Sequence, residues 1–230
     1  MKLPPITNLR QDDTRRLVPS KYALEGQSPL ARLVDEDGAL RQLSELESAT
    51  DDRLLGESGR LPGISIHELV FGVLYARIVN AAFTHARPQG GRFNGPERGA
   101  WYAGFRLETA RAEVAFHRSR ELQEINWPHK EVFDYVEYLA DFRAGFHDMR
   151  NQVEFRDCLA PDTYARSQRL AQVLLTQGSV GIVYPSVRER THRSCLACFR
   201  PALVTNVRRG VSLTITFENA AARPVFVTHS

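Results

Sequence analysis

The sequence predicts an α+β protein with a mixed, mostly antiparallel β core and flanking helices. Two observations support this class. Helical and strand patterns follow one another without the regular β-α-β alternation of a doubly wound sheet, and the segment after residue 194 reads as one short strand after another. With 230 residues, of which 43% are hydrophobic and 25% charged, the chain can bury a core of its own.

The first 68 residues differ from the rest, and we expect them to form a helical N-terminal extension. Leucines recur at near-helical spacing between Leu30 and Leu46, with a break at Gly38, which indicates two short helices. A cluster of glycines and a proline follows at residues 56–63 and marks a boundary. Residues 69–230 are therefore expected to form the main domain.

Local patterns predict the elements of the main domain in order. The apolar stretch 69–79 reads as a helix end or a strand that leads into a strand, and the glycine- and proline-rich residues 88–96 read as a loop. Strands are expected at 101–103, 132–139, 180–184, 195–199, 203–208, 212–217 and 225–228, and helices at 108–125 and 162–177.

Charge and apolar length exclude several classes of protein. The net charge of +3 is too small and too evenly distributed to indicate nucleic-acid binding. The longest apolar run, Leu69–Ala76, is far shorter than the roughly 18 residues of a membrane span. The first ten residues lack the apolar core of a secretory signal, and three cysteines are too few for a disulfide scaffold. We therefore expect a cytoplasmic protein without a membrane partner.

Short motifs contain the residues best suited to chemistry. They are Arg77 in Tyr-Ala-Arg-Ile, Arg92 in Gly-Gly-Arg-Phe-Asn, Tyr102 in the next strand, Glu113 and His117 on the following helix, and Ser186 at the end of Gly-Ile-Val-Tyr-Pro-Ser. In this order and spacing, over about residues 74–199, the motifs resemble those of the RES domain, a family named for its Arg, Glu and Ser.

The resemblance implies an enzyme that consumes NAD on a fold similar to that of ADP-ribosyltransferases. The expected reaction cleaves the nicotinamide–ribose bond, with phosphate or water as acceptor and no metal, as in an NAD phosphorylase or glycohydrolase. Matched residue by residue, Arg77 and Arg92 are the NAD-contacting arginines and Tyr102 is the aromatic contact, while Glu113 and Ser186 are the family's glutamate and serine. Phe93 stands where the family more often has tryptophan.

The same resemblance implies the toxin of a bacterial toxin–antitoxin pair, so the expected protein partner is an Xre-like antitoxin. The sequence leaves the oligomeric state open, a homo-oligomer included.

The residue types also suit this chemistry on physical grounds. Cleavage of a glycosidic bond to a cationic nicotinamide builds positive charge on the ribose, which a carboxylate such as Glu113 can stabilise. Guanidinium groups bind phosphates through forked hydrogen bonds, as expected for Arg77 and Arg92. Ser186 lacks the G-x-S-x-G elbow of a nucleophile, so we expect it to hydrogen-bond the dinucleotide.

Two alternatives remain. The first is transfer of ADP-ribose onto a protein target. The second is a non-catalytic binding module whose C-terminal strands contact a partner, with or without a zinc ion held by His192, Cys195 and Cys198 and by Cys158 as a fourth ligand. The zinc interpretation is disfavoured because residues three apart on a strand point to opposite faces.

Overall fold

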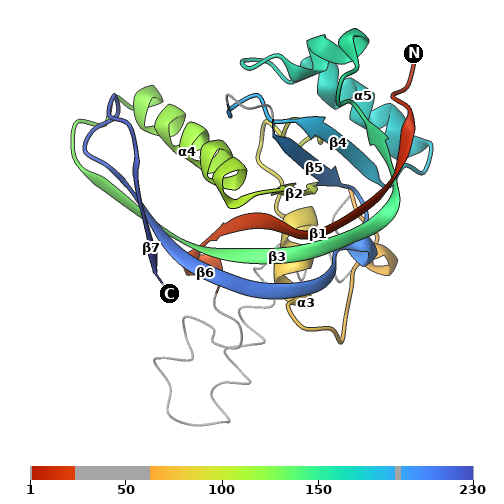
Figure 1. The fold of residues 1–230 in the computed structure, drawn as a ribbon, viewed down its shortest axis with the longest axis horizontal. Coiled ribbons are helices and arrows are strands. Elements are labelled where there is room, and N and C mark those ends of the chain that lie inside the picture. Colours follow the sequence, from red (N-terminus) through yellow and green to blue (C-terminus); the bar gives the residue numbers. More distant parts are fainter. Residues whose placement is uncertain (1, 24–62, 190–192, 230) are drawn as a thin grey trace.

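The computed structural model describes residues 2–23, 63–189 and 193–229, which form one seven-stranded sheet and three α-helices (Figure 1). The strands are β1 (Ile6–Pro19), β2 (Trp101–Gly104), β3 (Glu131–Asp148), β4 (Gly181–Pro185), β5 (Ser194–Cys198), β6 (Thr205–Phe217) and β7 (Val225–His229). The α-helices are α3 (Ala76–Thr84), α4 (Leu107–Glu124) and α5 (Ala165–Thr176). No helix within these ranges is long and apolar enough to cross a membrane.

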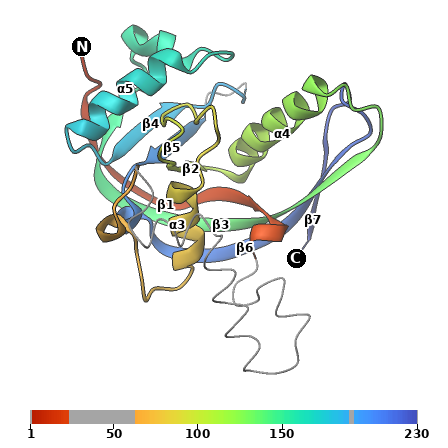
Figure 2. The same cartoon turned by 180° about the vertical axis from the view of Figure 1, so that it is seen from behind.

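The sheet has the order β1-β2-β5-β4-β3-β6-β7, and β1 also pairs with β3. This extra pairing closes β1, β2, β5, β4 and β3 into a ring, from which β6 and β7 extend. Among the described strands, only β3 and β4 pair in parallel. In both views, α4 and α5 stand on either side of the short strands β2, β4 and β5 (Figure 2). The predicted α+β class with a mostly antiparallel core is confirmed.

Most predicted elements of the main domain are present, but three predictions need correction. β3 continues to Asp148, past the expected end at residue 139. The two strands expected at 203–208 and 212–217 are one strand, β6, which runs through Gly210 without a turn; a Cβ there would lie 2.2 Å from a carboxylate oxygen of Glu137. The stretch 69–79 contains no strand and runs into α3.

The expectation of a helical extension over residues 1–68 is wrong for residues 6–19, which form β1 in the same sheet as the main domain. β1 pairs with β3 from Ile6 to Pro19. The register shifts between Gln11 and Thr14, where Asp13 has φ 53°, so the buried residues of β1 do not alternate with period two. The leucine-rich stretch 30–46 lies outside the described residues.

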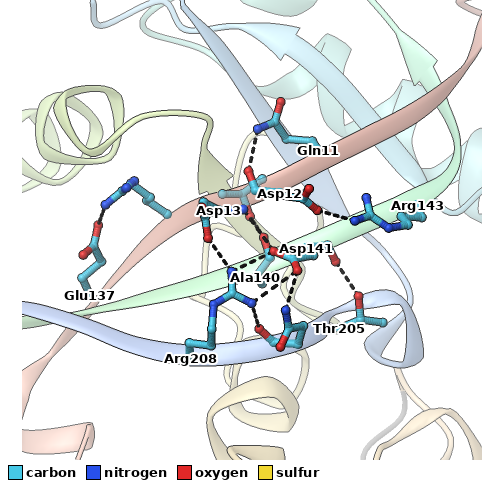
Figure 3. A network of polar contacts seen from close by, with 12 residues as sticks. Gln11, Asp12, Asp13, Glu137, Ala140, Asp141, Arg143, Thr205 and Arg208 are labelled. Atoms are coloured by element: carbon cyan, nitrogen blue, oxygen red, sulfur yellow. Dashed lines mark hydrogen bonds and ion pairs between the residues drawn. The ribbon is translucent and has the colours of Figure 1, made fainter.

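A cluster of charged side chains joins β1, β3 and β6 at this register shift (Figure 3). The carboxylate of Asp141, 8% exposed, accepts hydrogen bonds from Arg208 Nη2 at 2.9 Å and from the backbone N–H of Asp13 at 3.0 Å. Asn206 donates a third at 2.7 Å, and Arg208 also pairs with the Asp13 carboxylate. The hydrogen bonds from Arg208 lower the pKa of Asp141 to about 2. We call these four residues the Asp141 cluster.

Candidate active site

A cavity of about 260 Å³ lies where β1, β2 and α4 meet the segment after α3 and the glycine-rich loop. The polar and charged residues that line it include Arg15 and Arg16 of β1, Arg87, Asn94, Tyr102, and Glu113 and His117 of α4. Among the described residues that line the cavity, Glu113 is the one carboxylate, and three are arginines. This volume is slightly below the range of about 300–1,000 Å³ typical of ligand sites, so the cavity can hold part of a larger ligand.

Glu113 is joined to the chain segment that follows β4. The Oγ of Ser186, a fully buried residue, donates a 2.8 Å hydrogen bond to Glu113 Oε1. The same Oγ accepts hydrogen bonds from the backbone N–H groups of Arg188 and Glu189 at 3.2 and 3.3 Å. One turn earlier on α4, Thr109 Oγ1 donates to Glu189 at 2.6 Å. These bonds fix the position of the Glu113 carboxylate relative to residues 186–189.

The electrostatic environment of α4 acts on two side chains one turn apart. Burial raises the pKa of Glu113, while the hydrogen bond from Ser186 and the positive charges of Arg188 and Arg92 oppose this rise. Burial and the neighbouring arginines, Arg87 first among them, lower the pKa of His117 to about 4. At neutral pH the imidazole is therefore uncharged, and the positive charge of the site comes from arginines.

The glycine-rich loop is built around the hydroxyl of Tyr102. This hydroxyl donates to Asn94 Oδ1 at 2.7 Å and accepts from the backbone N–H of Phe93 at 2.8 Å. A Cβ at Gly91 would lie 2.8 Å from the same oxygen, so only glycine allows this approach. Burial raises the pKa of Tyr102, which stays protonated and presents its ring to the cavity.

The two sequence-predicted arginines do not line this cavity. Arg92 is 7% exposed, and its Nη1 donates to the backbone carbonyls of Cys158 at 3.2 Å and Ala160 at 2.8 Å. Its guanidinium lies 4.7 Å from the ring centroid of Tyr164. Arg77 is exposed in the first turn of α3. The structure thus brings Tyr102, Glu113 and Ser186 together, places Arg92 close enough to act on the pKa of Glu113, and leaves Arg77 apart from the cavity.

Comparison with known proteins agrees with this arrangement of motifs. The family model of the RES domain matches residues 69–218, well over half of the chain. The chain belongs to the RES domain family. Among solved structures, a chain of the M. tuberculosis MbcT-MbcA toxin-antitoxin complex is similar at 11% identity and a TM-score of 0.49, over 90% of this chain and 85% of that one. No curated protein matches the sequence.

Sequence reasoning missed several arginines in and around this cavity. Arg15 and Arg16 lie in β1, outside the matched residues and inside the segment expected to be a helical extension. Arg87 precedes the glycine-rich loop. Arg188 lies two residues after Ser186; its guanidinium sits 3.3 Å from the ring centroid of Phe116 and donates to the Pro161 carbonyl at 2.6 Å. Its closeness to Ser186 in sequence was the available signal.

The zinc alternative finds little support in the described part of the RES domain. Cys195 and Cys198 pack into different core clusters on opposite faces of β5, as the strand geometry predicted. Both thiols and that of Cys158 are free and buried. Within residues 2–23, 63–189 and 193–229, no three His, Cys, Asp or Glu side chains are placed to hold a metal ion. His192 lies outside these residues.

Proposed function

We propose that this RES domain cleaves the nicotinamide–ribose bond of NAD in the cavity beside Glu113. The observation that carries the proposal is a single, largely enclosed carboxylate, oriented by Ser186 and surrounded by arginines. A carboxylate in such a setting can face a developing cation, and the arginines can face the phosphates of the same ligand. Family membership, with the activity that the motif resemblance implies, supports the choice of NAD.

In the proposed reaction, the bond between C1′ of the ribose and the nicotinamide nitrogen breaks, and its electron pair leaves with neutral nicotinamide. The ribose gains oxocarbenium character, which the ionised Glu113 carboxylate stabilises. An oxygen of the acceptor then forms the new bond to C1′. Phosphate gives ADP-ribose 1″-phosphate, and water gives ADP-ribose and a proton.

The remaining site residues receive supporting roles. The ring of Tyr102 offers a flat surface for nicotinamide, since its hydroxyl is already engaged by Asn94 and Phe93. Ser186 fixes the Glu113 carboxylate and favours its ionised form. Arg92 supports the site through its charge and by holding the carbonyls of Cys158 and Ala160; direct contact of Arg92 or Arg77 with NAD stays a prediction.

The test is nicotinamide release from NAD by the purified protein, followed by chromatography with and without inorganic phosphate. We expect release, with a phosphorylated ADP-ribose product when phosphate is the acceptor and free ADP-ribose when water is. Label from adenine-labelled NAD that appears on a protein instead would favour ADP-ribose transfer. The absence of nicotinamide release under all of these conditions would contradict the proposal.

We also propose that the protein is the toxin of a toxin–antitoxin pair, because membership of the RES family and depletion of NAD both fit that role. Induced expression in a bacterial host should then arrest growth and lower cellular NAD. Expression of Glu113→Gln at the same protein level should do neither. Equal arrest by both proteins would show that growth inhibition does not depend on this site.

A further inference from the structure

The charge of the cavity is uneven, and one of its cations has no acidic partner among the described residues. Arg15 Nη1 lies 2.6 Å from the buried carboxylate of Glu137, and Arg87 Nη2 lies 3.5 Å from that of Glu121. Arg16, the third lining arginine, forms no ion pair with any carboxylate in the described parts of the chain. Arg16 is half-buried, and charges withdrawn from water in proteins are normally paired or bound to a ligand of opposite charge.

The surroundings of Arg16 leave part of its guanidinium unused. Nη1 donates to the backbone carbonyl of Tyr102 at 3.2 Å, and the guanidinium lies 5.0 Å from the ring centroid of Trp101. Its Nε is buried and has no hydrogen-bond partner in the described structure. Burial, together with the charge of Arg87, lowers the pKa of Arg16 to about 10, so the group is still charged at neutral pH.

We propose that Arg16, together with Arg87 at the cavity rim, forms a subsite for the phosphate oxygens of the substrate or of the acceptor. This inference rests on the proposed function, because it places a phosphate in the same cavity as Glu113. Each guanidinium group donates forked hydrogen bonds. Two of them therefore match the several charged oxygens of a phosphate ligand better than the two oxygens of a single carboxylate ligand. The subsite depends on β1, which lies outside the RES family match.

The positions of the sequence-predicted arginines strengthen this assignment. The Nη1 of Arg92 is committed to two backbone carbonyls, and Arg77 is exposed away from the cavity lining. Arg16 and Arg87 therefore supply the charge that a phosphate inside this cavity would meet. The phosphate is either the diphosphate of the dinucleotide or the free acceptor, and the two sources are distinguishable by experiment.

The first experiment measures binding by isothermal titration, with ADP-ribose and inorganic phosphate as separate ligands. Relative to the wild type, Arg16→Gln should weaken the binding of at least one of them by roughly tenfold or more, since it removes a charged hydrogen-bond donor. Arg87→Gln, at an exposed position, should weaken the binding of the same ligand without affecting the fold. Arg166→Gln, an exposed arginine of α5 outside the cavity, is the matched control and should bind normally.

The pattern of losses identifies the source of the phosphate. Weaker binding of ADP-ribose alone, with a raised KM for NAD, assigns the subsite to the diphosphate. Weaker binding of phosphate alone, with a raised KM for phosphate, assigns it to the acceptor. Unchanged affinities in folded Arg16→Gln and Arg87→Gln, or no binding of either ligand by the wild type, would overturn the subsite. If the variants lose binding but the wild type never releases nicotinamide from NAD, the subsite is retained and the proposed reaction is rejected.

Discussion

The Asp141 cluster and the Glu113 site use the same kinds of side chain to opposite effect. In the Asp141 cluster, arginine, asparagine and a backbone N–H all donate to one carboxylate, and its pKa falls to about 2. In the Glu113 site, one serine donates to the carboxylate, the arginines lie around it rather than on it, and burial raises its pKa. A carboxylate with all its partners inside the protein stabilises the fold, whereas one left short of partners is available to a ligand.

The largest effect is expected at the carboxylate of the Glu113 site. Glu113→Gln should lower kcat for nicotinamide release by on the order of 10²–10³, the usual effect of removing one group that stabilises transition-state charge. The melting temperature should stay equal or rise. Because folding raises the pKa of Glu113, its ionised form costs stability above its ordinary pKa, and glutamine removes that cost.

Glu108→Gln, an exposed glutamate in the first turn of the same helix, is the matched control for this prediction and should leave kcat unchanged. Equal kcat values for wild type and Glu113→Gln would remove Glu113 from the chemistry. A large drop in melting temperature for Glu113→Gln would place it with Asp141 as a structural carboxylate.

The reverse result is expected in the Asp141 cluster. Asp141→Asn should lower the free energy of unfolding by roughly 1.5–3 kcal/mol, since it weakens charged hydrogen bonds that join β1, β3 and β6. The kcat of the folded protein should change little. Denaturant titration measures the first quantity, and nicotinamide release below the melting temperature measures the second.

The pH dependence of stability sharpens the same prediction. The folded-state pKa of Asp141, about 2, is below its ordinary value of 3.8, so its stabilising contribution is complete above pH 3.8 and is lost as the pH falls toward 2. The difference in unfolding free energy between wild type and Asp141→Asn should therefore shrink over this window. A difference that stays constant from pH 6 to pH 2 would mean that the charge of Asp141 is not what stabilises the cluster.

The smallest effect is expected from the hydrogen bond that partly offsets burial at Glu113. Ser186 donates to the ionised carboxylate and lowers its pKa, so Ser186→Ala should raise the pKa of Glu113 further. Because the proposed reaction needs the ionised Glu113 carboxylate, the acid limb of the profile of kcat against pH should move to higher pH. On this limb, kcat should fall about tenfold at a given pH.

Thr109→Val is the control for the serine substitution. It removes the neighbouring hydrogen bond to Glu189, on the same segment, without touching the Glu113 carboxylate. Its acid limb should coincide with that of the wild type. An acid limb that moves equally in both variants would show that the segment's position, not the hydrogen bond, sets the pH dependence.

The sequence allowed the fold class to be predicted, and three of the candidate site residues lie close together in the structure. The amphipathic pattern of α5, the end of α4 shortly before Pro128 and the apolar runs of β4 and β5 are local, so they could be identified without tertiary information. The order of the motifs placed Tyr102, Glu113 and Ser186 in one predicted site. Although 73 positions separate Glu113 and Ser186, the Ser186 Oγ lies 2.8 Å from Glu113 Oε1.

What the sequence did not reveal depends on long-range pairing. β1 is a strand because β3 and β2 pair with it, and the register shift near Asp13 removes the alternation that would have indicated a strand. Arg15 and Arg16 could not be assigned to the cavity without that pairing. Arg92 is part of the family motif, but its sequence context does not show which acceptors its guanidinium contacts. Those acceptors are two backbone carbonyls at the end of η4 (Val153–Leu159).

The most direct test of the central claim is the crystal structure of Glu113→Gln soaked with NAD. The account predicts intact NAD with its nicotinamide ribose beside residue 113 and the nicotinamide near the Tyr102 ring. NAD bound at another surface, or residue 113 separated from the ribose by protein side chains, would contradict it.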